Sequence, residues 1–153
     1  MALAMLADPS GREREILGSI KYQENETVLH TDRSVLPENP KAWASWNYLV
    51  PKRAIGKVAL TYYMNRLQSI ESENHFCVTL NQSEAVSPEK RINTFLYHHP
   101  VYTPKCLEAR KRRGEINGIN RTFYCGAYWY YGFHEDGVRS ALDVTSHFGI
   151  MRI

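Results

Sequence analysis

Apolar residues recur at helical spacing at both ends of the chain and at strand spacing between them. In residues 2–20 the apolar positions are interrupted by Asp8–Gly11, whose proline and glycine end one helix and begin another. The pattern predicts a short helix, a turn and a second helix. Near the other end, Val138 and Leu142 share one face of a helix predicted from about residue 135 to 148.

The middle of the chain contains four segments typical of strands. Each is rich in Val, Thr, Tyr, Phe or Trp and is bounded by Pro, Gly, Asn or Ser. The segments are residues 27–31, 43–49, 57–64 and 75–80. Trp46 and Tyr48 alternate with Asn47, which is the period of a sheet with one packed and one wetter face. We therefore predict an α+β fold, with a mostly antiparallel sheet packed by helices in a single partial domain over residues 1–153.

The last third of the chain predicts a helix, a strand and a second helix. Pro104 suits the first turn of a helix that runs to about Arg113 and stops at Gly114. Its basic end, residues 110–113, is predicted to be a solvated helix terminus, where cations complement the dipole. Residues 122–127 predict a strand that leads through a turn into the closing helix.

Three glycines punctuate that last strand, turn and helix. Gly126, Gly132 and Gly137 allow close approach of the backbone to a flat ligand, and the start of the helix offers free amides. A helix N-terminus also favours negative charge, such as that of a reduced flavin near its N1 and O2 atoms. Ordinary turn and cap chemistry is the alternative explanation for the same glycines.

Composition excludes several classes of protein. Of the 153 residues 43% are hydrophobic and 23% are charged, which is typical of a globular chain. A net charge of +3 gives no reason to expect a nucleic-acid partner, although residues 110–113 are locally basic. The apolar runs are shorter than the roughly 20 residues of a transmembrane segment, and the opening residues do not form a secretory signal. We therefore expect a cytoplasmic location.

The cysteines and the residues around His134 do not indicate a catalytic or metal site. The three cysteines have no CxxC spacing, so we expect free thiols, with Cys125 inert in a buried strand. His134, Glu135 and Asp136 are adjacent at a helix start, where their side chains point in different directions. We therefore expect no metal site.

Six motifs carry a resemblance that covers nearly the whole chain. They are VLHTD at Val28–Asp32, AWASWNY at Ala42–Tyr48, TYYMNRLQ at Thr61–Gln68, FCVTLN at Phe76–Asn81, HHPVYTP at His98–Pro104 and CGAYWYYGFHEDG at Cys125–Gly137. The stretch Phe123–Val144 resembles the C-terminal FAD-binding motif of the flavin amine oxidases and phytoene-desaturase-like enzymes. The six motifs together make the whole chain similar to a subgroup of predicted NAD/FAD-binding, amine-oxidase-like proteins also found fused to plant cyclopropane fatty acid synthases.

The resemblance implies an FAD-dependent oxidoreductase, a flavoprotein whose flavin accepts the hydride, so we nominate no general base. Gly126 and Ala127 would lie against the ribityl and phosphate part of FAD, and the amides of His134 and Glu135 would face the flavin edge. Trp129 and Tyr130 would lie near the isoalloxazine or a substrate tunnel. The full set of implied cofactor-binding residues is Gly126, Ala127, Trp129, Gly132, His134, Glu135 and Gly137.

One departure from the family pattern shapes the expected function. Family members begin with a GxGxxG turn that binds the pyrophosphate, and this sequence contains none. We therefore expect a fragment that lacks the N-terminal Rossmann unit, does not retain FAD alone and is inactive alone. A substrate lobe would cover about residues 1–103, and an FAD-contacting strand, turn and helix about residues 121–150.

Two functions remain open from the sequence. The first is the C-terminal portion of an FAD-dependent oxidoreductase that acts on a small molecule or lipid, such as an amine or an unsaturated lipid. The second is a non-catalytic remnant or partner module that keeps the fold and binds no flavin. The missing GxGxxG favours the second, and the motif at Cys125–Gly137 favours the first.

Overall fold

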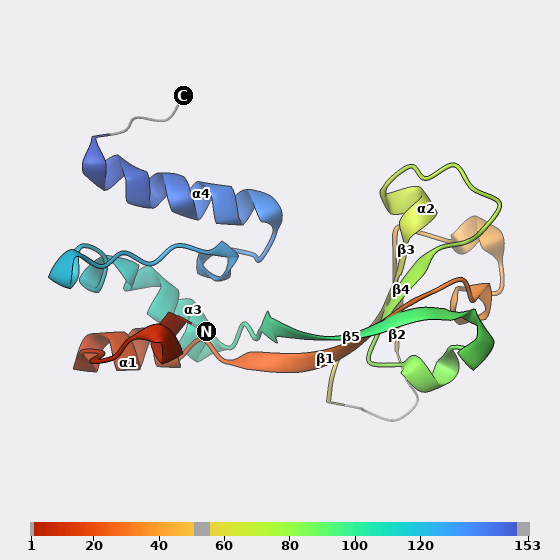
Figure 1. Ribbon diagram of the computed structural model, residues 1–153, viewed down its shortest axis with the longest axis horizontal. Helices are drawn as coiled ribbons and strands as arrows, with labels where there is room; N and C mark the ends of the chain where they lie inside the picture. The colour runs from red at the N-terminus through yellow and green to blue at the C-terminus, as the bar shows by residue number, and fades with distance from the viewer. Residues whose placement is uncertain (1, 51–55, 150–153) are drawn as a thin grey trace. The chain divides into compact units, whose positions relative to one another are not determined.

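The computed structural model describes residues 2–50 and 56–149 and confirms an α+β chain with a sheet and helices (Figure 1). The chain divides into two compact units. Unit 1 combines residues 1–23 with residues 100–153, and unit 2 comprises residues 24–99. Residues 2–23, which we expected in a substrate lobe, therefore group with the C-terminal part of the chain.

Unit 2 is built on a five-stranded sheet with the strand order β2-β3-β4-β1-β5 (Figure 1). The strands are β1 Tyr22–His30, β2 Trp46–Leu49, β3 Ala59–Tyr63, β4 Cys77–Leu80 and β5 Arg91–Pro100. The β2–β3, β3–β4 and β1–β4 pairs are antiparallel, as predicted. The strand β5 was not predicted, and a short helix, α2 (Met64–Leu67), directly follows β3.

The packed face of this sheet carries polar side chains. His30, Thr79 and Thr61 lie on β1, β4 and β3, and all three are buried. Because the amide of Asp32 donates to Nδ1 of His30 at 3.1 Å, the ring carries its proton on Nε2 and donates it to Thr79 Oγ1 at 2.8 Å. The hydroxyl oxygens of Thr79 and Thr61 are also 2.8 Å apart. The buried polar groups therefore satisfy one another across three strands.

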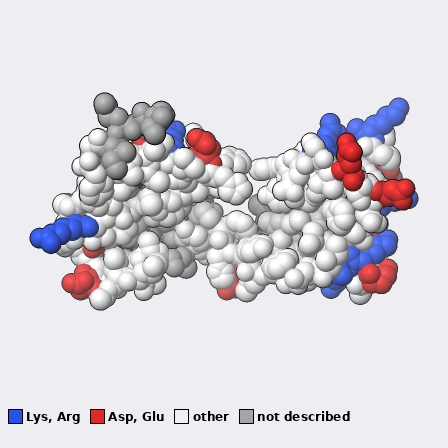
Figure 2. Space-filling view, turned by 45° about the horizontal axis from the view of Figure 1, so that its top comes forward, with Lys and Arg blue, Asp and Glu red and all other residues white. Residues whose placement is uncertain are grey.

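The opposite face of the sheet is apolar and is exposed along the edge strand β2. Trp46 stands opposite Tyr62, and Leu60 stands opposite Leu80. Trp46 is 50% exposed and Tyr48 is 63% exposed. The strands β2, β3 and β4 carry no charged residue, and Figure 2 shows broad uncharged surface between small groups of charged side chains. The buried face is mixed, since Val28, Ala59 and Cys77 are buried on it beside the polar side chains, whereas β2 leaves apolar rings exposed on the opposite face.

Asp32 fixes the chain beyond the end of β1. Its carboxylate is buried and accepts hydrogen bonds from the amides of Ser34 (3.1 Å) and Ser87 (2.9 Å) and from Lys90 Nζ (3.2 Å). Burial raises the pKa of this carboxyl, but the amide hydrogen bonds outweigh it and hold the pKa well below its usual value. The acidic residue of the VLHTD motif is therefore a structural tie.

Unit 1 contains three helices, α1 Gly11–Gly18, α3 Pro104–Lys111 and α4 His134–Thr145. Of these, α1 and α3 pack around an apolar cluster, and α4 packs on the turn η8 (Ala127–Trp129). Ser10 caps α1 in a capping box with Glu13, and Thr103 caps α3. The buried cluster contains Ile16, Leu17, Ile20, Cys106, Ala109, Ile116, Tyr124 and Trp129. The helices predicted in residues 2–20, from Pro104 and from about residue 135 are thus confirmed, the first as a 3-10 turn followed by α1.

Short 3-10 turns connect the larger elements. They are η1 Ala2–Met5, η2 Arg33–Val35, η3 Pro40–Ala42, η4 Ser83–Ala85, η5 Pro88–Lys90, η6 Arg113–Glu115, η7 Ile119–Arg121, η8 Ala127–Trp129 and η9 Ser146–Phe148. No helix among the described residues is both long and apolar enough to cross a bilayer.

The strand predicted at residues 122–127 is absent, and that prediction is wrong. Residues 122–125 are irregular, and η8 begins at Ala127. The backbone of this segment does not pair with a strand. The amide of Tyr124 instead donates to the side chain of Asn117, at Oδ1, over 2.9 Å. Tyr124 is buried in the apolar cluster of unit 1. The aromatic residues of this segment therefore serve core packing and not strand pairing.

Candidate functional site

The turn after Tyr124 is fastened to the helix α4. The amide of Gly126 donates to Ser140 Oγ at 3.1 Å, and Ser140 is fully buried within α4. Gly126 has φ +149, a conformation that side chains rarely adopt, and a Cβ there would overlap the ring of Tyr128. Glycine is therefore required here by the chain's own fold.

Gly132 is constrained in the same way, whereas Gly137 is not. Gly132 has φ +96, and a Cβ built on it would lie 2.7 Å from the hydroxyl of Tyr102. A Cβ on Gly137 would meet only the amide nitrogen of Ala127, at 4.0 Å. Of the three glycines, only Gly137 thus leaves space that the chain does not fill itself.

The first turn of α4 is open at its N-terminus. Phe133 occupies the cap position and makes no side-chain cap hydrogen bond. The Asp136 carboxylate instead accepts from the amides of Tyr131 (3.1 Å) and Phe133 (3.0 Å). The amides of His134 and Glu135 have no acceptor within the helix, and no side chain in the described part of the chain caps them. Two backbone donors with a partial positive charge therefore face outward at this point.

Trp129 supports the turn from inside. It is 3% exposed, and its Nε1 donates to the carbonyl of Tyr124 at 3.0 Å. Its own carbonyl accepts from Arg110 Nε at 2.8 Å. The indole therefore holds the turn in place and has little surface left for a ligand.

Arginines layer on the aromatic segment that follows Trp129. Arg139 lies over the ring of Tyr130, 4.2 Å from its centroid, and Arg113 lies 5.6 Å from the same centroid. Arg113 also pairs with Asp143 at 3.0 Å, and Asp143 accepts the hydroxyl of Tyr130. Arg110 and Arg113 are half-buried. The prediction that residues 110–113 form a solvated helix end is therefore wrong for these two residues, because their guanidinium groups pack on the turn.

The cysteines differ from one another in exposure. Cys77 and Cys106 are buried, and burial raises the pKa of both thiols, that of Cys77 to about 12. Cys125 is exposed, contrary to our expectation, because residues 122–125 form no buried strand. No group of three or more His, Cys, Asp or Glu side chains within the described residues is placed to hold a metal ion.

The structure gathers only part of the predicted residue set around open space. Ala127, His134, Glu135 and Gly137 meet at the start of α4, whereas the Cβ positions of Gly126 and Gly132 face the chain's own tyrosines. Sequence reasoning missed Ser140, because it lies on the polar side of the predicted helix, opposite Val138 and Leu142, where burial is not expected.

Comparison with protein-family models finds no match to this chain. The chain also matches none of the curated proteins.

Proposed function

We propose that this chain is the C-terminal, flavin-contacting portion of an FAD-dependent oxidoreductase of the amine oxidase and desaturase kind. The observation that carries the proposal is the start of α4, where the amides of His134 and Glu135 lie uncapped and Gly137 leaves open space near Ala127. A flat ring edge with oxygen and nitrogen acceptors fits such a surface. The motif CGAYWYYGFHEDG, which resembles the C-terminal flavin motif, adds support.

The chain's own residues would bind and orient the cofactor. The first-turn amides of α4 would donate to the pyrimidine edge, and the helix dipole would stabilise negative charge there. When bound, FAD supplies the hydride acceptor. Ser140 and Trp129 would keep the turn rigid from below. Gly126 and Gly132 would act indirectly, through the positions of Tyr128 and Tyr102.

The proposed substrate is a small molecule, either an amine or an unsaturated lipid. The open face of the unit 2 sheet, where Trp46 and Tyr48 are exposed, supports an apolar substrate or covering surface. Contacts to the adenine, ribose and pyrophosphate would have to come from a GxGxxG-bearing segment, which this sequence does not contain.

A second candidate function is a module that keeps the fold and binds no flavin. The observation that favours it is the filling of the Gly126 and Gly132 positions by Tyr128 and Tyr102. In that case all three glycines serve turns and packing alone.

Reconstitution separates these two functions. The 153-residue chain is mixed with a GxGxxG-bearing N-terminal segment from a related flavoenzyme, and bound flavin is read from its visible absorbance after gel filtration. We expect a colourless isolated chain and a yellow complex. Gly137→Val should abolish the colour because its side chain enters the open space beside Ala127.

Gly114→Val is the matched control, since a Cβ at Gly114 meets nothing within 4 Å and Gly114 lies outside the turn. Circular dichroism checks that both variants fold. A Gly137→Val complex that binds flavin as well as the Gly114→Val complex would contradict the proposed flavin contact.

A further inference from the structure

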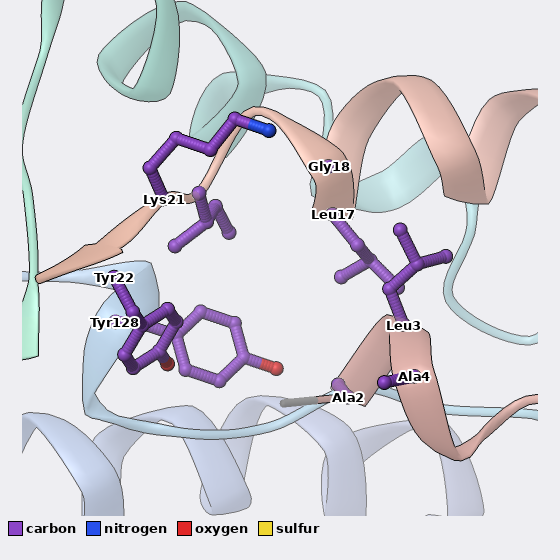
Figure 3. A pocket seen from close by; sticks show the side chains of 9 residues that line it. Ala2, Leu3, Ala4, Leu17, Gly18, Lys21, Tyr22 and Tyr128 are labelled. Atoms are coloured by element: carbon purple, nitrogen blue, oxygen red, sulfur yellow. The ribbon is translucent and has the colours of Figure 1, made fainter. Parts of the chain in front are cut away.

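Unit 1 contains a cavity that the proposed flavin contact does not use. Its volume is about 420 Å³, within the range of small-molecule sites. It is lined by η1, the end of α1, the start of β1 and Tyr128 (Figure 3). All lining residues except Tyr128 lie outside the Gly126–Gly137 segment. Tyr128 is the one residue that the cavity shares with the proposed flavin turn.

The apolar side of the cavity is anchored in the core of unit 1. Leu17 and Ile20 belong to the buried cluster, and Leu3 packs against that cluster. In Figure 3, Leu3 and Leu17 stand across the open space from the rings of Tyr22 and Tyr128. Because the core fixes these side chains, the cavity is preformed and needs little reorganisation to accept an alkyl chain.

The polar groups of the cavity are two phenol hydroxyls and one ammonium. The hydroxyl of Tyr22 forms no hydrogen bond with any residue in the described ranges. Phenols are protonated near neutral pH, and burial moves the pKa of Tyr22 further up and that of Tyr128 to about 12. Lys21 lines the rim, and its ammonium pairs with no carboxylate within the described ranges. The cavity thus combines an apolar wall with two neutral hydroxyls and one cation.

This combination matches an amphiphile with an anionic head. We propose that the cavity binds a medium-chain fatty carboxylate, with its alkyl chain between Leu3 and Leu17 and its carboxylate at Lys21. An ammonium and a carboxylate form a charge-assisted hydrogen bond, which a neutral head group would not match. Each additional buried methylene should raise affinity about fourfold until the cavity is full.

The test uses the whole 153-residue chain without flavin. Hexanoate, octanoate, decanoate and decanol are titrated calorimetrically below their micelle-forming concentrations. We expect saturable binding of one carboxylate per chain, with affinity rising about fourfold per methylene and then levelling off. Decanol should bind more weakly than decanoate.

Variants show which residues bind the head group and which bind the alkyl chain of the ligand. Lys21→Met should weaken decanoate binding by about tenfold or more and leave decanol unchanged, since it removes only the ammonium. Lys105→Met, at an exposed lysine of α3 outside the cavity, is the matched control and should change neither ligand. Leu3→Trp should block both ligands by filling the space.

Three results would contradict the proposed carboxylate site. One is a lack of saturable binding, and another is equal affinity for decanoate and decanol. A third is equal loss of decanoate binding in Lys21→Met and Lys105→Met. Because no flavin is present, failure of the flavin reconstitution does not affect any of these readings.

Discussion

At the scale of single residues, buried polar groups in both units are bonded to one another. Glu13 is the clearest case in unit 1: it is buried, one oxygen accepts from the amide (2.7 Å) and hydroxyl (2.7 Å) of Ser10, and the other accepts the hydroxyl of Tyr124. The bond to Tyr124, followed by those to Ser10, lowers the pKa of Glu13. One carboxylate thus ties α1 to the segment before Gly126.

Tyr124→Phe should destabilise the chain by about 1–3 kcal/mol near neutral pH, because a buried carboxylate loses a hydrogen-bond donor. The lowered pKa of Glu13 means that its stabilisation is complete above its ordinary pKa and is lost as pH falls through the folded value. The difference between variant and wild type should therefore shrink in acid. Urea unfolding near neutral pH and near pH 3 measures both free energies.

Tyr48→Phe is the matched control for that substitution. Tyr48 is exposed, and its hydroxyl bonds to nothing in the described part of the chain, so the free energy of unfolding should be nearly unchanged. Equal effects of the two substitutions would show that the Glu13–Tyr124 bond does not stabilise the fold.

His30 predicts a pH dependence in unit 2. Burial lowers its pKa, although the neighbouring Asp32 carboxylate opposes the shift. The unfolded chain therefore binds a proton at His30 before the folded chain does, and stability should fall as pH drops below about 6.5. Chemical unfolding between about pH 7 and about pH 5 measures the slope.

His30→Gln should flatten this slope, whereas His147→Gln should preserve it, since His147 is exposed and lies in unit 1. If the free energy of unfolding changes with pH equally in wild type and His30→Gln, the buried imidazole of His30 is not the cause of that pH dependence.

At the scale of elements, the sequence locates helices better than it locates their buried faces. The helix α1 begins where Ser10 and Glu13 form a capping box, a purely local signal. The helix α4 also forms where predicted, but Val138 is 53% exposed, while Ser140 is fully buried and holds Gly126. The packed side of α4 is therefore partly the polar one.

The burial of Ser140 and the exposure of Val138 on the same helix can be tested by substitution. Ser140→Ala should cost about 1–3 kcal/mol because it leaves the amide of Gly126 without an acceptor. Val138→Lys, the matched partner on the same helix, should change stability by less than about 0.5 kcal/mol. Thermal and urea unfolding of both variants provide the comparison. A larger loss from Val138→Lys would mean that the apolar side of α4 is the packed one.

At the scale of the whole molecule, both units leave apolar surface open. In unit 2 this surface includes Trp46 and Tyr48 on the edge strand β2, and in unit 1 it includes Val138 of α4. Surfaces of this kind mark sites that a partner or ligand covers. The isolated chain is therefore expected to bind apolar dyes and to self-associate.

A charge placed on the open sheet face should suppress self-association. Trp46→Lys with Tyr48→Lys should lower dye fluorescence and shift gel-filtration elution toward the monomer, because two cations disfavour burial of this face. Glu84→Lys, an exposed change outside the strands, serves as the control. A monomeric wild-type chain that binds no dye would show that the face is not adhesive.

Local signals determined much of the architecture. Strand-forming residues and turn residues in sequence predicted four of the five strands, and caps and proline predicted the helices, because these depend on neighbouring residues. The strand β5 was not predicted, because its RINTFLYHHP sequence shows weak alternation of apolar and polar residues and ends in proline. Residues 122–125 were misassigned because aromatic side chains suit both strands and cores.

The sequence by itself determined the α+β class, the glycine-punctuated approach to α4 and the absence of a GxGxxG turn. Only the tertiary structure decided which faces are buried, because the same alternation allows either face to pack. It buried His30 and exposed Trp46, and it placed Tyr128 over Gly126 while leaving Gly137 open. These outcomes depend on contacts between residues distant in sequence, which local patterns do not encode.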